Sequence, residues 1–226
     1  MTGGRVALWD NAKLLVLVLV VVGHVIEQVK DVGYGPWALF AFLYIFHIPT
    51  IFLVAGVFAR TQVDRKTVAA VAQLVVAYVA WEFINAGVRY LVEGETIRPG
   101  FLVNPSMALW FLLALATMRI VLPFLDMLRH PLLVSVAIAL GAVLLPDVGT
   151  AFSAARTCAF LPFFVAGHVL ARRGVFQDPR FREPSRLSRG AALGLLACGL
   201  LALVAVPRLW TGWDLTDWLF RKTSVT

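Results

Sequence analysis

The feature that most constrains the fold of this chain is a series of long apolar runs. In the first, ten of the eleven residues from Leu14 to His24 are apolar or glycine. A helix needs about 20 mostly apolar residues to cross a bilayer, and most of the runs approach that length. The runs cover approximately residues 12–26, 36–58, 67–91, 107–125, 131–145, 154–170 and 187–206. The sequence therefore predicts an all-α, polytopic bundle with about seven membrane-spanning helices.

The composition excludes an ordinary soluble domain. Hydrophobic residues make up 60% of the 226-residue chain and charged residues 15%, with a mean hydropathy of +0.84. A soluble domain is about 45–50% apolar and about 25% charged, so the solvent here must be lipid. The net charge of +7 does not indicate nucleic-acid binding. Lys and Arg stand in short clusters between the runs, as topology signals do, and form no single patch.

Nothing in the sequence divides the chain into domains, and residues 1–226 are predicted to form a single integral-membrane domain. Repeats and linkers are not found. Cys158 and Cys198 lie inside apolar runs and are interpreted as small buried hydrophobes. Their spacing gives neither a disulfide framework nor a metal site.

The positions of Lys and Arg predict the orientation. With the N-terminus inside, the inner segments contain 13 of these residues and the outer segments 5. The outer five are Lys30, Arg89, Arg98, Arg156 and Arg208. This asymmetry predicts a multi-pass cell-membrane protein with a cytoplasmic N-terminus. Three tryptophans in residues 209–220 suit the membrane interface. The basic loop at residues 171–186 is either a topology signal or a contact for an anionic cofactor.

Polar side chains form a stripe on the first predicted helix. At 100° per residue, Lys13 and His24 differ in direction by about 20°, and they lie about 16 Å apart along the axis. Asp10 shares this face, and Glu27 follows His24 by one turn. An ionisable group within a membrane span usually faces the bundle interior or a water-filled cavity. His24 is therefore a candidate functional residue.

A second histidine, His47, stands in the next run. The connection between the two runs is short, so the two helices are expected to be antiparallel neighbours. His47 and His24 are then expected within one or two turns of each other in depth. The two histidines have two possible interpretations: they form a structural hydrogen-bonded pair, or they line a reaction chamber.

Four segments carry a resemblance to a known family. DNAKLLVLVLVVVGH and FHIPTIFLVAGVF are followed by LWFLLALATMR (residues 109–119) and RTCAFLPFFVAGHVL (residues 156–170). In this order they resemble the membrane-bound acyltransferase 3 family, and within it the branch related to fucose 4-O-acetylases. Each segment alone is a common apolar pattern and a weak signal. Four such segments in the order of the family are a specific signal for that family. The resemblance extends from the N-terminus to about residue 170.

The resemblance implies transfer of an acyl group, usually acetyl, from acyl-coenzyme A to a hydroxyl of a sugar or another acceptor. The family pattern of a basic residue, ten intervening positions and a histidine falls on Lys13 and His24. His47 matches the histidine of the second segment, and Arg156 an arginine at the start of the fourth. His168 stands where the branch commonly has an aromatic residue. Family domains usually have more helices, so the final helices are expected to be missing or divergent.

These residues suit acyl transfer to a hydroxyl. His24 would serve as the base that takes the hydroxyl proton, and Glu27 would fix its ring tautomer. His47, Tyr44 and Asn85 are candidate donors to the developing oxyanion. The predicted substrate-binding residues are Lys13, Asp10, Asn11, Arg156 and Glu82, with Lys13 meeting donor phosphates. For Glu82, a structural polar contact is the alternative. We expect no metal and no tightly bound cofactor, with acyl-coenzyme A as the donor substrate.

Two other functions fit the sequence. A small transporter could use His24 and His47 for a proton relay. A catalytically incomplete membrane scaffold would fit the expected loss of the final helices. Dependence on an acyl thioester separates the acyltransferase from both alternatives.

Overall fold

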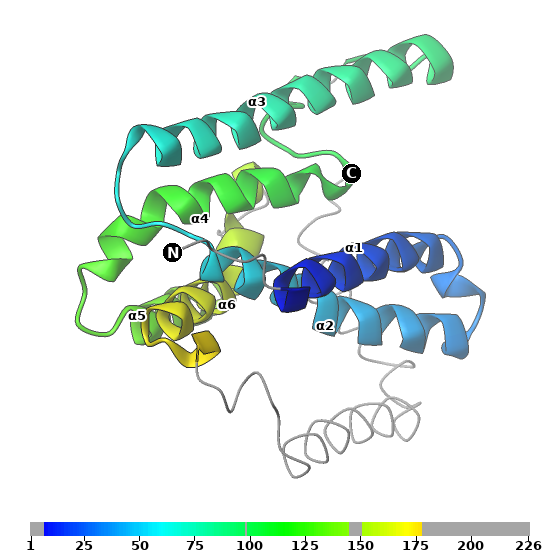
Figure 1. Ribbon diagram of the computed structural model, residues 1–226. Coiled ribbons are helices and arrows are strands. Elements are labelled where there is room, and N and C mark those ends of the chain that lie inside the picture. Colours follow the sequence, from blue (N-terminus) through cyan, green and yellow to red (C-terminus); the bar gives the residue numbers. More distant parts are fainter. Residues whose placement is uncertain (1–6, 98, 145–150, 178–226) are drawn as a thin grey trace. The chain divides into compact units, whose positions relative to one another are not determined.

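The computed structural model describes residues 7–97, 99–144 and 151–177 (Figure 1). Within this part, all regular elements are helical and no strand occurs, so the predicted all-α class is confirmed there. The α-helices are α1 (Ala7–Glu27), α2 (Tyr34–Val57), α3 (Arg65–Val88), α4 (Trp110–Asp126), α5 (Pro131–Leu144) and α6 (Ala154–Arg172). Short helical turns occupy Lys30–Val32, Arg89–Glu93, Met107–Leu109, Ala151–Ser153 and Val175–Gln177.

Three helical segments are long and apolar enough to cross a membrane: Gly35–Val57, Arg65–Glu93 and Ala151–Arg172. The first six predicted runs agree with α1 to α6 to within a few residues at each end. The seventh run, at residues 187–206, and the tryptophan-rich segment at 209–220 lie outside the described residues. Seven spans and a cytoplasmic N-terminus stay predictions.

The chain divides into two compact units, which we describe separately. The first comprises Met1–Val54 and Leu170–Thr226. In it, α1 and the greater part of α2 lie side by side (Figure 1). Just beyond the end of α1, Lys30 Nζ lies 5.0 Å from the centre of the Phe40 ring. Glu27, at the end of α1, accepts a hydrogen bond from the hydroxyl of Tyr44, which lies one turn after Phe40 on α2. Residue numbers thus decrease from Lys30 to Glu27, while those of their partners on α2 increase from Phe40 to Tyr44. The two helices are therefore antiparallel, as predicted.

In the second unit, Ala55–Val169, α4 contributes more buried residues than any other described helix. Its buried residues are Trp110, Ala114, Leu115, Ala116, Met118, Leu122 and Leu125. Helix α3 packs along α4 (Figure 1), yet it buries only Tyr78 and Glu82. Much of the rest of α3 is apolar and exposed, for example Val76 and Phe83. Such a surface suits lipid, because soluble proteins rarely expose apolar patches of this extent.

Polar contacts fix both ends of α3. At the start, Asp64 accepts a hydrogen bond from the Thr67 backbone N–H at 2.7 Å, which is the N-cap geometry. This hydrogen bond lowers the pKa of Asp64. Towards the other end, the Tyr78 hydroxyl donates to the Leu102 carbonyl at 2.8 Å. The connection between α3 and α4 is thereby held against α3.

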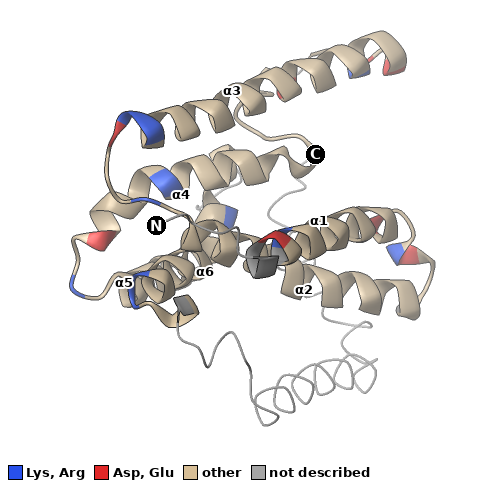
Figure 2. Ribbon diagram, viewed as in Figure 1, with Lys and Arg blue, Asp and Glu red and all other residues tan. Residues whose placement is uncertain are grey.

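Helix α2 ends with a close backbone contact to α6. A Cβ atom added at Gly56 would lie 1.9 Å from the Phe164 carbonyl oxygen and 3.2 Å from the His168 nitrogen. Only glycine fits there, because the clashing atoms belong to the α6 backbone and cannot turn aside. Most charged residues lie at the ends of the helices or between them (Figure 2), as expected for helices whose middle portions face lipid or one another.

Candidate active site

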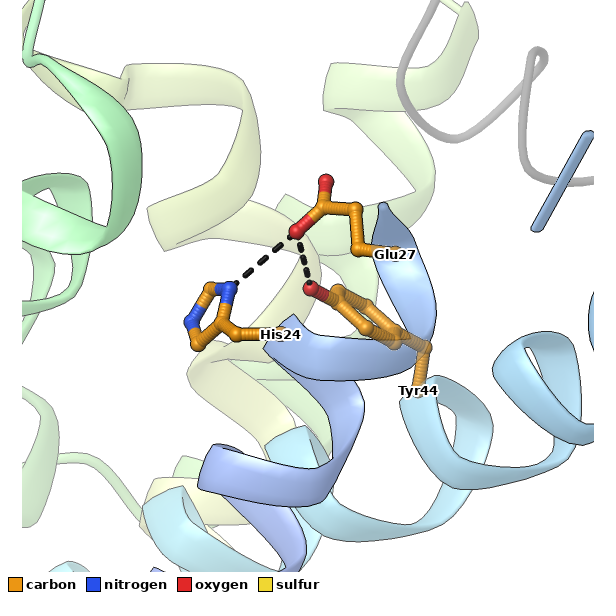
Figure 3. A network of polar contacts seen from close by, with 3 residues as sticks. All are labelled: His24, Glu27 and Tyr44. Carbon is orange, nitrogen blue, oxygen red and sulfur yellow. Dashed lines mark hydrogen bonds and ion pairs between the residues drawn. The ribbon is translucent and has the colours of Figure 1, made fainter. Parts of the chain in front are cut away.

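The C-terminal end of α1 carries a histidine–carboxylate pair (Figure 3). His24 Nδ1 lies 3.1 Å from Glu27 Oε2. The two residues are three positions apart on one helix, where side chains are neighbours, so the local helix geometry alone brings them together. The contact that the sequence predicted between these two residues is present.

Tyr44 of α2 joins the same carboxylate. Its hydroxyl donates to Glu27 Oε2 at 3.0 Å, and its ring lies edge-on to the His24 ring at a centroid distance of 6.4 Å. Figure 3 shows the Tyr44 hydroxyl and the His24 ring converging on one carboxylate oxygen. Tyr44 was expected as an oxyanion donor; its hydroxyl proton instead goes to Glu27. This contact ties α2 to the pair.

His47 lies one turn from Tyr44 on α2. Its Nδ1 bonds to the carbonyl of Leu43, and its ring is edge-on to Tyr44 at 4.9 Å. A Cβ atom at Gly23 would lie 3.3 Å from His47 Cε1 and 3.8 Å from His47 Nε2. The absence of a side chain at Gly23 therefore lets this ring approach α1 directly beside His24.

The hydrogen bonds determine the ring tautomers. An ionised carboxylate and a carbonyl oxygen can only accept, so Nδ1 is the donor in both His24 and His47. In each neutral ring, Nε2 then carries the lone pair. His24 is thus arranged as a base at Nε2, with Glu27 behind it. A neutral His47 accepts at Nε2 and cannot donate there, so a role as oxyanion donor requires its protonated form.

Exposure separates the two histidines. The side chain of His24 is 43% exposed and that of Glu27 38%, whereas His47 is 3% exposed. A reacting group must reach a substrate, and His24 meets that condition. The burial of His47 favours a role in positioning its neighbours.

The other predicted residues of the first segment also lie on α1. Asp10, Asn11 and Lys13 are exposed near its start. From Lys13 to His24 the helix is continuous, so the predicted separation of about 16 Å holds along its axis.

Glu82 and Arg156 belong to the second unit. Glu82 is buried and accepts from the backbone N–H of Ser106 at 2.6 Å and from its hydroxyl at 2.8 Å. This geometry favours the structural interpretation of Glu82, which holds the connection preceding α4. The guanidinium carbon of Arg156 lies 5.0 Å from the centre of the Trp110 ring. Substrate binding by either residue stays a prediction.

The sequence did not reveal a second histidine–carboxylate pair. His168 Nε2 of α6 lies 3.3 Å from Asp126 Oδ1 at the end of α4. The side chains are 8% and 16% exposed. The partners are 42 residues apart, so only tertiary packing brings them together.

A comparison with protein families now bears on this site. The family model described as an acyltransferase domain, that of the acyltransferase 3 family, matches residues 6–223. The chain belongs to the acyltransferase 3 family. The family match, together with the three long apolar helices, supports a membrane acyltransferase.

In this acyltransferase 3 chain, the basic residue and the histidine of the family pattern, Lys13 and His24, occupy opposite ends of one helix. Nearly the whole chain is covered by the match, which reaches beyond the four segments that carried the resemblance. Comparison with curated proteins and with solved structures gives no significant match.

Proposed function

We propose that the chain transfers an acyl group, expected to be acetyl, from acyl-coenzyme A to a hydroxyl of a carbohydrate or another acceptor, with His24 as the base. The observation that carries this proposal is the 3.1 Å contact between His24 Nδ1 and Glu27. It leaves Nε2 as the proton acceptor on a half-exposed ring. Family membership supports acyl transfer as the reaction class.

The proposed chemistry follows from the tautomer. His24 Nε2 takes the proton of the acceptor hydroxyl as its oxygen attacks the thioester carbonyl. Glu27 stabilises the imidazolium that forms, and Tyr44 keeps the carboxylate in place. When the thioester C–S bond breaks, the imidazolium returns the proton to the coenzyme A sulfur. Helix α1 thus supplies the base, its carboxylate partner and the proton for the leaving group, and α2 supplies Tyr44, which positions the carboxylate.

Lys13 is the proposed contact for the donor phosphates. Coenzyme A is anionic at its nucleotide end and reactive at its thioester end. A helix that places Lys13 about 16 Å from His24 suits such a two-ended substrate. Asp10 and Asn11, exposed beside Lys13, are proposed to contact the same nucleotide portion through hydrogen bonds.

The proposal is tested with the purified full chain in detergent, acetyl-coenzyme A labelled in the acetyl group, and a cell-envelope carbohydrate fraction as acceptor. The wild type should transfer label and release coenzyme A thiol. Lys13→Ala should raise the donor KM with kcat nearly unchanged, because uniform binding is lost. Lys30→Ala removes the same side chain beyond the other end of α1, so the donor KM should not change.

Two results would count against the proposal. Absence of label transfer across acceptor fractions would favour a transporter or a scaffold. An unchanged donor KM in Lys13→Ala would remove the donor contact while leaving the His24 chemistry to be judged separately.

A further inference from the structure

The start of α6 in the second unit collects polar side chains that no step of the proposed reaction uses. Ser153 immediately precedes α6, and Arg156 and Thr157 lie in its first turn. Ser153 therefore precedes Arg156 by three residues and Thr157 by four, directly ahead of the helix. The Cα–Cβ bond of a helical residue tilts toward the N-terminus, so the Thr157 side chain leans toward the start of α6. Both hydroxyl residues are buried, with exposures of 3% and 7%.

Neither hydroxyl has a hydrogen-bond partner among the described residues. Ser153 Oγ and Thr157 Oγ1 are buried and unpaired. Elsewhere in this chain, helical hydroxyls donate to a carbonyl of the preceding turn: Thr50 to Phe46 at 2.7 Å and Thr117 to Leu113 at 2.9 Å. Buried polar groups in native proteins are almost always paired. The two hydroxyls at the start of α6 therefore indicate a partner that is not part of the described protein.

The backbone holds this position in an unusual conformation. Phe152 and Ser153 have positive φ values of 51° and 58°, in the left-handed region that non-glycine residues rarely adopt. The Phe152 N–H donates to the Val103 carbonyl at 2.7 Å, which fixes the turn. The first backbone N–H groups of a helix have no partner within the helix. Ser153 would ordinarily cap one of them through its hydroxyl, and here it does not.

The charge at this position selects the kind of partner. The Arg156 guanidinium is stacked over Trp110, and Trp110 is stacked on Phe160 with a centroid distance of 6.0 Å. Stacking fixes the direction of the guanidinium plane. A helix N-terminus and a guanidinium both favour an anion. Two hydroxyls, a guanidinium and backbone N–H groups are all hydrogen-bond donors, and a tetrahedral anion offers them more acceptor oxygens than a planar carboxylate.

We propose that Ser153, Arg156, Thr157 and the first turn of α6 form a phosphate-binding site. The site lies within the second unit and does not depend on the proposed acyl transfer. A phosphate can come from two sources, a phospholipid headgroup or a soluble phosphate compound. The donors would be the same in both cases.

The test measures binding of radiolabelled inorganic phosphate to the full chain in a neutral detergent. The wild type should bind phosphate, whereas acetate should not compete. Ser153→Ala and Thr157→Val should each weaken binding about 10-fold to 150-fold, as expected for one hydrogen bond to a charged group. Thr117→Val is the matched control, because its hydroxyl is already paired within α4, and its phosphate binding should equal that of the wild type.

Mixed micelles then identify the source of the phosphate. Competition by phosphatidylglycerol, but not by phosphatidylcholine, would assign the site to an anionic lipid headgroup. Binding that neither lipid displaces would assign it to a soluble phosphate compound. Whichever source is found, Ser153→Ala and Thr157→Val must reduce the binding of phosphate.

The same variants can overturn the proposal. Thr157→Val keeps the shape of the side chain, so without ligand its thermal midpoint should be at least that of the wild type. If it unfolds at a lower temperature and phosphate has no effect on the wild type, the hydroxyl binds a structural water and the proposal is wrong. Failure of the wild type to bind phosphate or phosphatidylglycerol, or equal binding by both hydroxyl variants, would also refute it.

Discussion

Two histidine–carboxylate pairs occur in the described part of the chain, one in each unit. His24 and Glu27 are three residues apart on α1, and about two fifths of each side chain is exposed. His168 and Asp126 join α6 to α4, and both are largely buried. The ring atoms differ as well: His24 meets its carboxylate through Nδ1, and His168 through Nε2.

A histidine–carboxylate contact therefore does not by itself indicate catalysis. His24 presents its Nε2 lone pair on an accessible ring, whereas His168 directs Nε2 at Asp126. The Gly56 contact lies beside His168 as well, so three helices meet there. We therefore assign reactivity to the pair in the first unit and packing to the pair in the second.

The largest expected effect concerns the packing around the buried pair. Gly56→Ala would place a Cβ atom 1.9 Å from the Phe164 carbonyl oxygen, and the backbone cannot move aside without separating α2 from α6. We expect almost no folded protein, measured as monodisperse material after detergent extraction. Gly87→Ala is the control, since a Cβ atom there has no neighbour within 4 Å and alanine favours a helix. Normal yields of Gly56→Ala would contradict the close packing.

The next effect falls on the accessible pair. In Glu27→Gln, the amide can donate to His24 Nδ1, which would move the ring proton to Nε2 and remove the base. The acyl-transfer rate should fall about 100-fold or more; in a catalytic triad the comparable amide substitution costs about 10⁴-fold in kcat, because the histidine takes the wrong tautomer. The measurement is kcat with labelled acetyl-coenzyme A. A rate within twofold of the wild type would mean that Glu27 does not control the tautomer.

Removing the buried histidine should change stability and not the rate. His168→Phe keeps an aromatic ring but leaves Asp126 without this contact, at a cost of about 1–3 kcal/mol. Heat inactivation should therefore occur at a lower temperature, while the transfer rate per folded molecule stays within twofold. A large loss of rate in a stable His168→Phe protein would reverse the assignment of the two pairs.

The smallest effect is expected at Tyr44. Tyr44→Phe removes the hydroxyl that donates to Glu27 at 3.0 Å and keeps the ring contacts. One hydrogen bond of about 1 kcal/mol corresponds to about fivefold in rate. The loss should appear in kcat, because the residue acts through Glu27 and does not bind the donor. A change confined to the donor KM would be inconsistent with this positioning role.

The helices were predictable because their signals are local. The apolar runs gave the positions of α1 to α6, and errors arose only at the ends. The predicted third run began at residue 67, whereas α3 begins at Arg65 because Asp64 caps the helix. The helical turn at Arg89–Glu93 has no hydropathy signal. Whether seven helices span the bilayer depends partly on residues outside the described ranges.

The candidate site was predictable in part for the same reason. His24 and Glu27 share one helix, so their contact follows from helix geometry. Tyr44 and Glu27 are 17 residues apart, and their contact depends on the register of α2 against α1. That register depends on tight packing at Gly23, which the pattern of apolar residues does not encode. The sequence therefore predicts that α1 and α2 are neighbours, but it does not predict which of their atoms are in contact.

The accessible His24 is the proposed base for acyl transfer, and chemical rescue of His24→Ala by imidazole is the sharpest test of that role. Without imidazole, this variant should lose about 10²–10⁴-fold in kcat, the usual range for a lost general base. Because the wild-type side chain is 43% exposed, added imidazole should enter the vacated site and restore part of the rate. The same addition should leave His168→Phe unchanged. A His24→Ala protein that is correctly folded and transfers acetyl groups at the wild-type rate without imidazole would contradict the claim.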